Sequence, residues 1–210
     1  MPAICFYFQV HQPARLRKYT YFDIGHSHHY EDDANNQAIL LKVANKCYLP
    51  TNALLLELIK KWDGQFKVAF SLSGSVIEQL KRYSPETLDS FKALVDTGCV
   101  EMLNETYHHS LTAVFSKKTF IEEVQQHQEL IKHEFGQTPT TFRNTELIYN
   151  NEVAALVESL GYQAILAEGA DKVLGWRSPN YLYQPHGTKK IKLLLKIILT
   201  LVVTHLLIIL

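Results

Sequence analysis

Short apolar segments alternate with longer segments of helical periodicity along most of the chain. Apolar runs bounded by turn residues are typical of buried strands, and their alternation with helices is typical of a parallel sheet. The pattern therefore predicts an α/β fold, either a parallel layer or a barrel. The predicted strands are Ala3–Val10, Phe66–Leu72, Cys99–Leu103, Thr141–Asn144 and Tyr162–Ala167.

The segments between these strands carry apolar residues three and four positions apart, as amphipathic helices do. After the first strand, one apolar helix face is predicted from Leu54, Leu55, Leu58, Ile59 and Trp62. A second helix is expected to begin at Ser84-Pro85, because serine caps helices and proline fits their first position. Two more are expected over Ser116 to Phe135 and from near Asn151, ended by Gly136 and Gly161.

The last stretch of the chain, residues 191–210, has a different character. From Ile197 to Leu210, 11 of 14 residues are aliphatic, and lysines including Lys192 and Lys196 precede this run. A membrane-spanning helix needs about 20 apolar residues, and His205 interrupts a run that is already short. A buried strand or an end not shaped by folding is favoured, and a membrane tether stays an alternative. We therefore expect one domain over 1–190 and an aliphatic tail over 191–210.

Charge and cysteine content restrict the class of protein. The 21 Lys and Arg residues balance 21 Asp and Glu residues, and no basic patch with interleaved aromatic residues occurs. Nucleic-acid binding is therefore not expected. Cys5, Cys47 and Cys99 are far apart, and the N-terminal segment reads as a strand with no signal-peptide pattern. These features predict a cytoplasmic protein with reduced thiols.

Candidate chemistry follows the predicted strands at their carboxyl ends, where barrel enzymes place functional side chains. In order, these positions hold His11, Ser71–Ser73, the segment Glu101 to His109, Glu146 and Glu168. Carboxylates and a histidine are therefore expected to meet at one mouth. Glycosidic bond cleavage requires such carboxylates, one to stabilise an oxocarbenium-like centre and one to protonate the leaving oxygen.

Three sequence motifs stand in order at these strand ends. They are FYFQVHQP at Phe6–Pro13, GCVEMLNETYHHS at Gly98–Ser110 and FRNTELIY at Phe142–Tyr149. They resemble the signatures of glycoside hydrolase family 57, the α-amylase and 4-α-glucanotransferase family. LGWRSPNYLY at Leu174–Tyr183 resembles the α-amylase branch of that family. The resemblance covers about Pro2 to Lys196.

The resemblance implies an incomplete (β/α)7 barrel and a retaining mechanism on α-1,4-linked glucans or maltooligosaccharides, without a cofactor. It implies that Glu146 is the nucleophile and that His11 and Glu101 bind substrate. Glu105 lies on the same face as Glu101 by strand alternation, and Arg143 is expected to keep Glu146 ionised by pairing. Further substrate-binding candidates near the expected mouth are Tyr107, His108 and Trp176.

A metal-dependent polysaccharide deacetylase with a related barrel is an alternative. The segment DIGHSHHYEDD at Asp23–Asp33 contains histidines and aspartates that could ligate zinc. However, the first strand ends in QVHQP rather than in paired aspartates, and His108 and His109 are adjacent rather than spaced as H-x-x-x-H. We therefore expect no metal, and a solvated or sugar-contacting loop whose aromatic residues, such as Tyr19 and Tyr21, could stack on pyranose rings.

A retaining glycosidase also needs a general acid, which in this family is an aspartate on a later strand. No Asp or Glu follows Asp171, and the family pattern stops near Lys196. The sequence therefore suggests a truncated catalytic domain that lacks its general acid. A non-catalytic sugar-binding remnant, tethered to a membrane through 191–210, is a further alternative. The activity of these 210 residues alone is left open.

Overall fold

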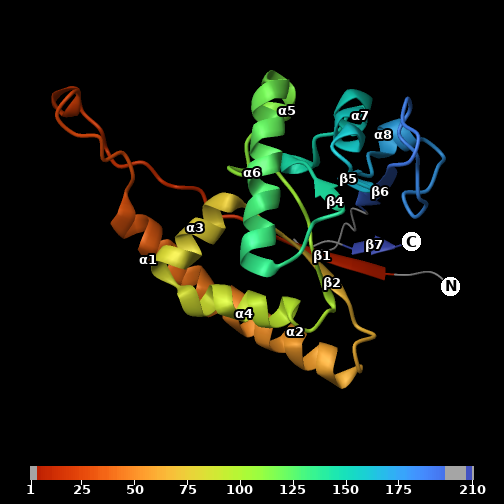
Figure 1. Cartoon of the computed structure of the whole chain (residues 1–210), viewed down its shortest axis with the longest axis horizontal. Coiled ribbons are helices and arrows are strands. Elements are labelled where there is room, and N and C mark those ends of the chain that lie inside the picture. The colour runs from red at the N-terminus through yellow and green to blue at the C-terminus, as the bar shows by residue number, and fades with distance from the viewer. Residues whose placement is uncertain (1–3, 197–206, 210) are drawn as a thin grey trace.

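Six parallel strands lie side by side in chain order and form part of a barrel (Figure 1). The computed structural model describes residues 4–196 and 207–209. One sheet has the order β3-β2-β1-β7 and the other has the order β4-β5-β6. Asn104 joins them by a parallel bridge to Phe142, so the parallel series continues from β1 to β6. The predicted incomplete barrel is confirmed.

The strands are short, and their predicted positions agree with the structure to within a few residues. Only the first five were predicted as defined strands. Their bounds are β1 Ile4–Val10, β2 Val68–Leu72, β3 Val100–Met102, β4 Thr141–Arg143, β5 Ala164–Glu168, β6 Lys192–Lys196 and β7 Leu207–Ile209.

The register of the strands sets the layers inside the barrel. Tyr7 pairs with Ala69, which pairs with Glu101, and Gln9 pairs with Ser71 one layer further along. Because alternate side chains point to the same face, Tyr7 and Gln9 both lie on one face of β1. Tyr7, Leu103, Leu147 and Leu166 form a small apolar cluster. Polar side chains follow it toward the carboxyl ends of the strands.

The outer face of β1–β3 is covered by helices α1 (Asp33–Val43), α2 (Leu49–Lys61), α3 (Gly74–Tyr83) and α4 (Pro85–Val95). A π-helical segment, Ala44–Tyr48, joins α1 to α2. On α2, Leu55 and Ile59 are buried as predicted, whereas Leu54 and Trp62 are more than half exposed. The predicted apolar face was therefore too wide, because only one side of α2 packs in the core that contains Leu55 and Ile59.

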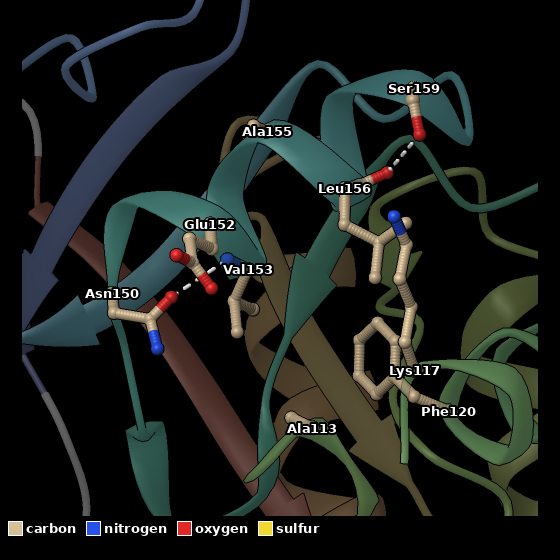
Figure 2. A pocket seen from close by; sticks show the side chains of 9 residues that line it. All are labelled: Ala113, Lys117, Phe120, Asn150, Glu152, Val153, Ala155, Leu156 and Ser159. Carbon is tan, nitrogen blue, oxygen red and sulfur yellow. Dashed lines mark hydrogen bonds between the residues drawn. The ribbon is translucent and has the colours of Figure 1, made fainter. Parts of the chain in front are cut away.

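The second half of the series is covered by α5 (Thr112–Phe115), α6 (Lys117–Phe135) and α7 (Asn151–Ser159), with the short α8 (Asp171–Leu174) after β5. The predicted ends of α6 are confirmed: Ser116 caps it, and Gly136 ends it in the left-handed conformation. At the start of α7, the Asn150 side chain accepts a hydrogen bond from the Val153 backbone N–H at 2.8 Å (Figure 2). Phe120, Val124, Val153, Val157 and Ile165 pack in the core of this half.

The loop after β1 projects from the body as an ordered arm (Figure 1). An antiparallel bridge joins Leu16 to Glu31, and the tip is a 3-10 turn at Tyr21–Asp23. Arg17 donates hydrogen bonds to Asp23 and Ser27, both at 3.1 Å, which ties the two sides of the arm together. The arm leaves Tyr21 and Phe22 exposed.

The aliphatic stretch at the end of the chain is only partly described. β6 pairs with β5 in parallel, and Ile191, Leu193 and Leu195 are buried in the core of the second half. β7 pairs antiparallel with β1. The predicted boundary at residue 190 thus falls just before a strand of the barrel. Most of the predicted tail, residues 197–206 and 210, lies outside the described residues. Within the described part, no helix is both long enough and apolar enough to cross a membrane.

Replacing Phe120 with alanine is expected to destabilise the fold by about 3–5 kcal/mol, because a fully buried phenylalanine leaves a cavity. Phe115, which is 80% exposed in the adjacent short helix, provides a matched control with an expected change within about 0.5 kcal/mol. Urea unfolding followed by circular dichroism measures both variants. Similar free energies of unfolding for Phe120→Ala and Phe115→Ala would contradict the placement of Phe120.

Candidate functional site

Glu105 is a fully buried carboxylate at the end of the third strand segment. Its Oε1 atom accepts a hydrogen bond from the Ser71 hydroxyl at 2.7 Å, and its Oε2 atom lies 2.7 Å from Nδ1 of His109. Burial alone would raise the pKa of Glu105, but the hydrogen bond to His109 and the charge of Arg143 lower it below its usual value. Glu105 is therefore an ionised group inside the protein.

His109 connects this buried carboxylate to the surface. While Nδ1 contacts Glu105, Nε2 lies 3.2 Å from Oε1 of Glu146 and 3.1 Å from the amide nitrogen of Gln9. The His109 side chain is only 8% exposed, whereas the Glu146 side chain is 69% exposed. One imidazole ring thus links two carboxylates, one buried and one open to solvent.

Arg143 and Gln9 complete the charged centre. Arg143 is buried, and its Nη2 atom donates a hydrogen bond to Oε1 of Gln9 at 2.7 Å. Its Nη1 atom lies 3.7 Å from Glu105 and has no hydrogen-bond partner among the described residues. The expected ion pair between Arg143 and Glu146 does not occur among the described ion pairs, because the guanidinium faces Glu105 and Gln9 instead.

His11 stacks on His109 with ring centroids 4.3 Å apart. Its Nδ1 atom is hydrogen-bonded to Ser73 Oγ at 2.7 Å, and Ser73 also caps α3. Burial, followed by the neighbouring His109, lowers the pKa of His11 to about 4. His11 is therefore neutral at physiological pH. We call Gln9, His11, Glu105, His109, Arg143 and Glu146 the Glu105 cluster.

Glu146 has an unusual backbone conformation. It lies in the 3-10 turn Thr145–Leu147 with φ 51° and ψ 23°, and Leu147 also has a positive φ of 55°. The left-handed region is uncommon for residues other than glycine and costs free energy, so the surrounding contacts must hold it. Thr145 Oγ1 lies 2.9 Å from Thr106 Oγ1, and Asn144 donates to the Ile148 carbonyl at 2.8 Å.

The loop from Thr106 to Ser110 is fixed by two glutamates. Glu123 on α6 accepts hydrogen bonds from the His108 backbone N–H at 3.0 Å and from the Ser110 hydroxyl at 2.8 Å. The Tyr107 hydroxyl donates to Glu78 at 2.6 Å, and burial followed by this hydrogen bond raises the pKa of Tyr107. These contacts hold His109, whose φ is also positive at 57°.

A second buried histidine supports the Glu105 cluster from below. His127 on α6 is fully buried, and burial lowers its pKa, so the ring is neutral. Nε2 donates to the Leu72 carbonyl at 2.7 Å, and Nδ1 accepts from the Glu105 backbone N–H at 3.4 Å. Its contact with Asn104, the residue that joins the two sheets, links the cluster to the barrel itself.

A cavity of about 540 Å³ opens beside Glu146, within the range of small-ligand sites. Its polar lining comes from the ends of two strands and the loop after α8, and comprises Glu146, Glu168, Arg177, Gln184 and His186 with Asn151. A second cavity of about 480 Å³ lies between α6 and α7 and is shown in Figure 2. It contains no member of the Glu105 cluster.

The other predicted site residues lie outside the Glu105 cluster. Glu101 is exposed on β3, two layers before Glu105, and accepts a hydrogen bond from Thr141 at 2.7 Å. Tyr107 is 6% exposed and packs on Gly74, where any side chain would collide with its ring. His108 is exposed, and Trp176 is 94% exposed and does not line the cavity beside Glu146. Their predicted contacts with substrate stay predictions.

Three of the loop residues considered as zinc ligands have structural partners. Asp32 caps α1 by accepting from the Asn35 backbone N–H at 3.0 Å, and Asp33 pairs with Arg82 at 2.9 Å. His29 lies 3.5 Å from Asp33. Across residues 4–196 and 207–209, no group of three His, Cys, Asp or Glu side chains is arranged to hold a metal ion.

The sequence placed Ser73 and His109 among the strand-end positions without giving either a role, and it did not place Gln9 in the site. The spacing of Glu105 and His109 by four residues gave no signal, because both follow a strand rather than lie on a helix. The alternation of β1 could have placed Gln9 on the same face as His11. Chemically, an exposed carboxylate oriented by a histidine can act as a nucleophile or a base.

Known proteins that resemble this chain in sequence belong to one family. The sequence profile described as Glycosyl hydrolase family 57 matches residues 5–198. A protein of Methanocaldococcus jannaschii, provisionally named an alpha-amylase, is 49% identical over 193 residues. The match covers 89% of this chain and 40% of that protein, so the chain spans less than half of its relative's length.

Two solved structures share the fold. The 4-alpha-glucanotransferase from Thermococcus litoralis superposes with a TM-score of 0.68 at 16% identity, covering 91% of this chain and 27% of that one. A provisionally assigned polysaccharide deacetylase from Mycobacterium smegmatis superposes with a TM-score of 0.55 at 15% identity, covering 90% of this chain and 56% of that one. At these identities the likeness concerns the fold alone.

Protonation of His11 is expected to destabilise the protein in acid. Its pKa is lower in the folded protein than the unfolded value of 6.5, so the unfolded chain binds the proton more tightly. The stabilisation is complete above pH 6.5 and is lost as the pH falls toward 4. Urea midpoints at pH 7 and pH 4.5 should therefore differ less for His11→Gln than for the unchanged protein. In the control variant His108→Gln, the difference between the urea midpoints at pH 7 and pH 4.5 should be as large as in the unchanged protein. If His11→Gln and His108→Gln reduce this difference equally, protonation of His11 is not the cause of the acid destabilisation.

Proposed function

The chain belongs to glycosyl hydrolase family 57, and we propose that it carries the nucleophile of a retaining glycosidase that acts on α-glucans. The exposed Glu146 carboxylate, held beside His109 and opening into a cavity, is the observation on which this proposal rests. The name of the M. jannaschii relative and the position of Glu146 in the third motif support it.

In the proposed first step, a carboxylate oxygen of Glu146 attacks the anomeric carbon of a glucosyl unit. The bond to the leaving oxygen breaks, and a covalent glycosyl ester forms. Water or a second sugar then releases the glycosyl group from the ester, which gives hydrolysis or transglycosylation. His11 and the polar groups that line the cavity, such as Arg177 and His186, are available to bind sugar hydroxyls. Glu101, Tyr107, His108 and Trp176 stay further candidates for substrate contact.

The leaving oxygen must also be protonated, by a carboxyl group about 5–5.5 Å from the nucleophile in retaining enzymes. Glu105 does not suit this role, because it is fully buried and its oxygens are engaged by Ser71 and His109. In the family, the acid is an aspartate on a strand after the third motif, whereas here the one aspartate after that motif is Asp171, which lies in α8, and no Asp or Glu follows it. We therefore propose that this chain provides the nucleophile and lacks the general acid.

Glucan binding without turnover is a second candidate function. The exposed aromatic side chains Tyr21, Phe22 and Trp176 favour it, because pyranose rings stack on such surfaces. Binding and bond cleavage are separable by experiment, since only cleavage modifies Glu146.

A substrate whose leaving group needs no protonation tests the proposed nucleophile directly. We expect a 5-fluoro-α-maltosyl fluoride to label the protein with one glycosyl group, because fluoride departs without a general acid and the second fluorine slows release of the ester. Mass spectrometry of the intact protein and of its peptides should place the added mass on Glu146.

The variant Glu146→Gln should take no label. Glu152→Gln changes an exposed carboxylate six residues further on and should be labelled like the unchanged protein. Label on another residue, or none on Glu146 while isothermal titration shows maltooligosaccharide binding, would contradict the proposal and favour the binding function.

A further inference from the structure

His109 has one nitrogen whose partner does not change. Its Nδ1 atom faces Glu105, whose carboxylate is ionised and can only accept a hydrogen bond. The other oxygen of Glu105 already accepts from Ser71. Nδ1 of His109 therefore carries a proton in every state of the site, and any change in protonation occurs at Nε2.

The Nε2 atom faces a donor and an acceptor at almost the same distance. The donor is the amide nitrogen of Gln9 at 3.1 Å, and the acceptor is Oε1 of Glu146 at 3.2 Å. The orientation of the Gln9 amide is fixed, because its oxygen accepts from Arg143 and an arginine can only donate. A single nitrogen cannot satisfy both neighbours at once.

Protonation of Nε2 therefore decides which contact is a hydrogen bond. Without a proton, Nε2 accepts from Gln9, and an ionised Glu146 receives nothing from His109. With a proton, Nε2 donates to Glu146, and the contact with Gln9 becomes an unfavourable approach of two donors. Nε2 of His109 thus has two alternative hydrogen-bond partners, Gln9 and Glu146.

The charges around His109 favour the protonated form when Glu146 is ionised. Glu105 already faces the Arg143 guanidinium, whose Nη1 atom lies 3.7 Å away, so Glu146, 3.2 Å from Nε2, is the carboxylate with no other cation beside it among the described residues. The remaining titratable neighbours are neutral: burial holds His11 and His127 unprotonated and Tyr7 protonated. A proton on Nε2 would therefore give the Glu146 carboxylate a charged hydrogen-bond donor.

Backbone strain supports the same contact. His109 and Glu146 both have positive φ angles, of 57° and 51°. Such conformations cost free energy and persist only where neighbouring contacts fix them. The hydrogen bond between these two side chains joins the two strained positions across 37 residues of sequence.

We propose that His109 is a positioning residue that holds the Glu146 carboxylate only while its Nε2 atom is protonated, and that Gln9 competes with Glu146 for that atom. The inference rests on the proposed function of Glu146, whose orientation it would control. When Nε2 loses its proton, it would accept a hydrogen bond from Gln9 instead of donating one to Glu146. Glu146 would then lose its fixed orientation.

Long-range 1H–15N NMR spectra of the histidine rings, recorded over a pH series, test this directly. In the unchanged protein, Nδ1 of His109 should stay protonated throughout the series, while Nε2 gains and loses its proton. Glu146→Gln removes a negative charge and should move the titration of Nε2 to lower pH by about one unit or more. Gln9→Met removes the competing donor and should move it to higher pH.

His108, which is exposed and adjacent in sequence, serves as the internal control and should titrate alike in all three proteins. Shifts of His109 in the same direction in both variants, or no shift in Glu146→Gln, would overturn the proposal. Glu146 is largely exposed, so Glu146→Gln decides the question alone if Gln9→Met fails to fold. The NMR result does not depend on glycosyl transfer: a shift of His109 without labelling of Glu146 would keep the contact and reject the chemistry.

Discussion

The site depends on the burial of one ionised carboxylate, Glu105, at the junction of the two sheets. An unpaired charge in this position would be costly, so the protein surrounds it with donors from several elements. Ser71 comes from β2, His109 from the loop after β3 and Arg143 from β4. Two of these partners in turn contact a further group: His109 contacts Glu146, and Arg143 contacts Gln9.

Two series of side-chain contacts lead outward from Glu105. Through His109 it reaches Glu146, the exposed carboxylate that we propose as the nucleophile. Through Arg143 it reaches Gln9, which returns to His109 and closes the network. His127 and Asn104 connect the same centre to α6 and to the bridge between the sheets. The parallel strands bring these residues together because their carboxyl ends meet on one side of the barrel.

Much of this arrangement could be predicted from the sequence. The apolar periodicity located β1 to β5 and the helices α4, α6 and α7, because burial imposes a strict pattern on such elements. The motifs pointed to His11 and Glu146. The choice between Glu101 and Glu105 could not be made, since strand alternation places both on one face, and only the tertiary contacts show that Glu105 meets His109 and Arg143. The predicted pairing of Arg143 with Glu146 was also wrong, because a spacing of three residues does not show which way a buried guanidinium points. The interior interactions of Gln9 and His109 involve side chains 100 residues apart, which no local pattern reveals.

The buried Glu105 carboxylate and His109 stabilise each other and thereby organise the site. A double-mutant cycle with Glu105→Gln, His109→Asn and the combined variant, measured by urea unfolding at pH 7, tests it most directly. The two substitutions are expected to be coupled by at least about 1 kcal/mol, because each removes the partner of the other. If the changes in the free energy of unfolding caused by the two substitutions instead add to within about 0.5 kcal/mol, Glu105 and His109 act independently. That result would contradict a site organised by their contact.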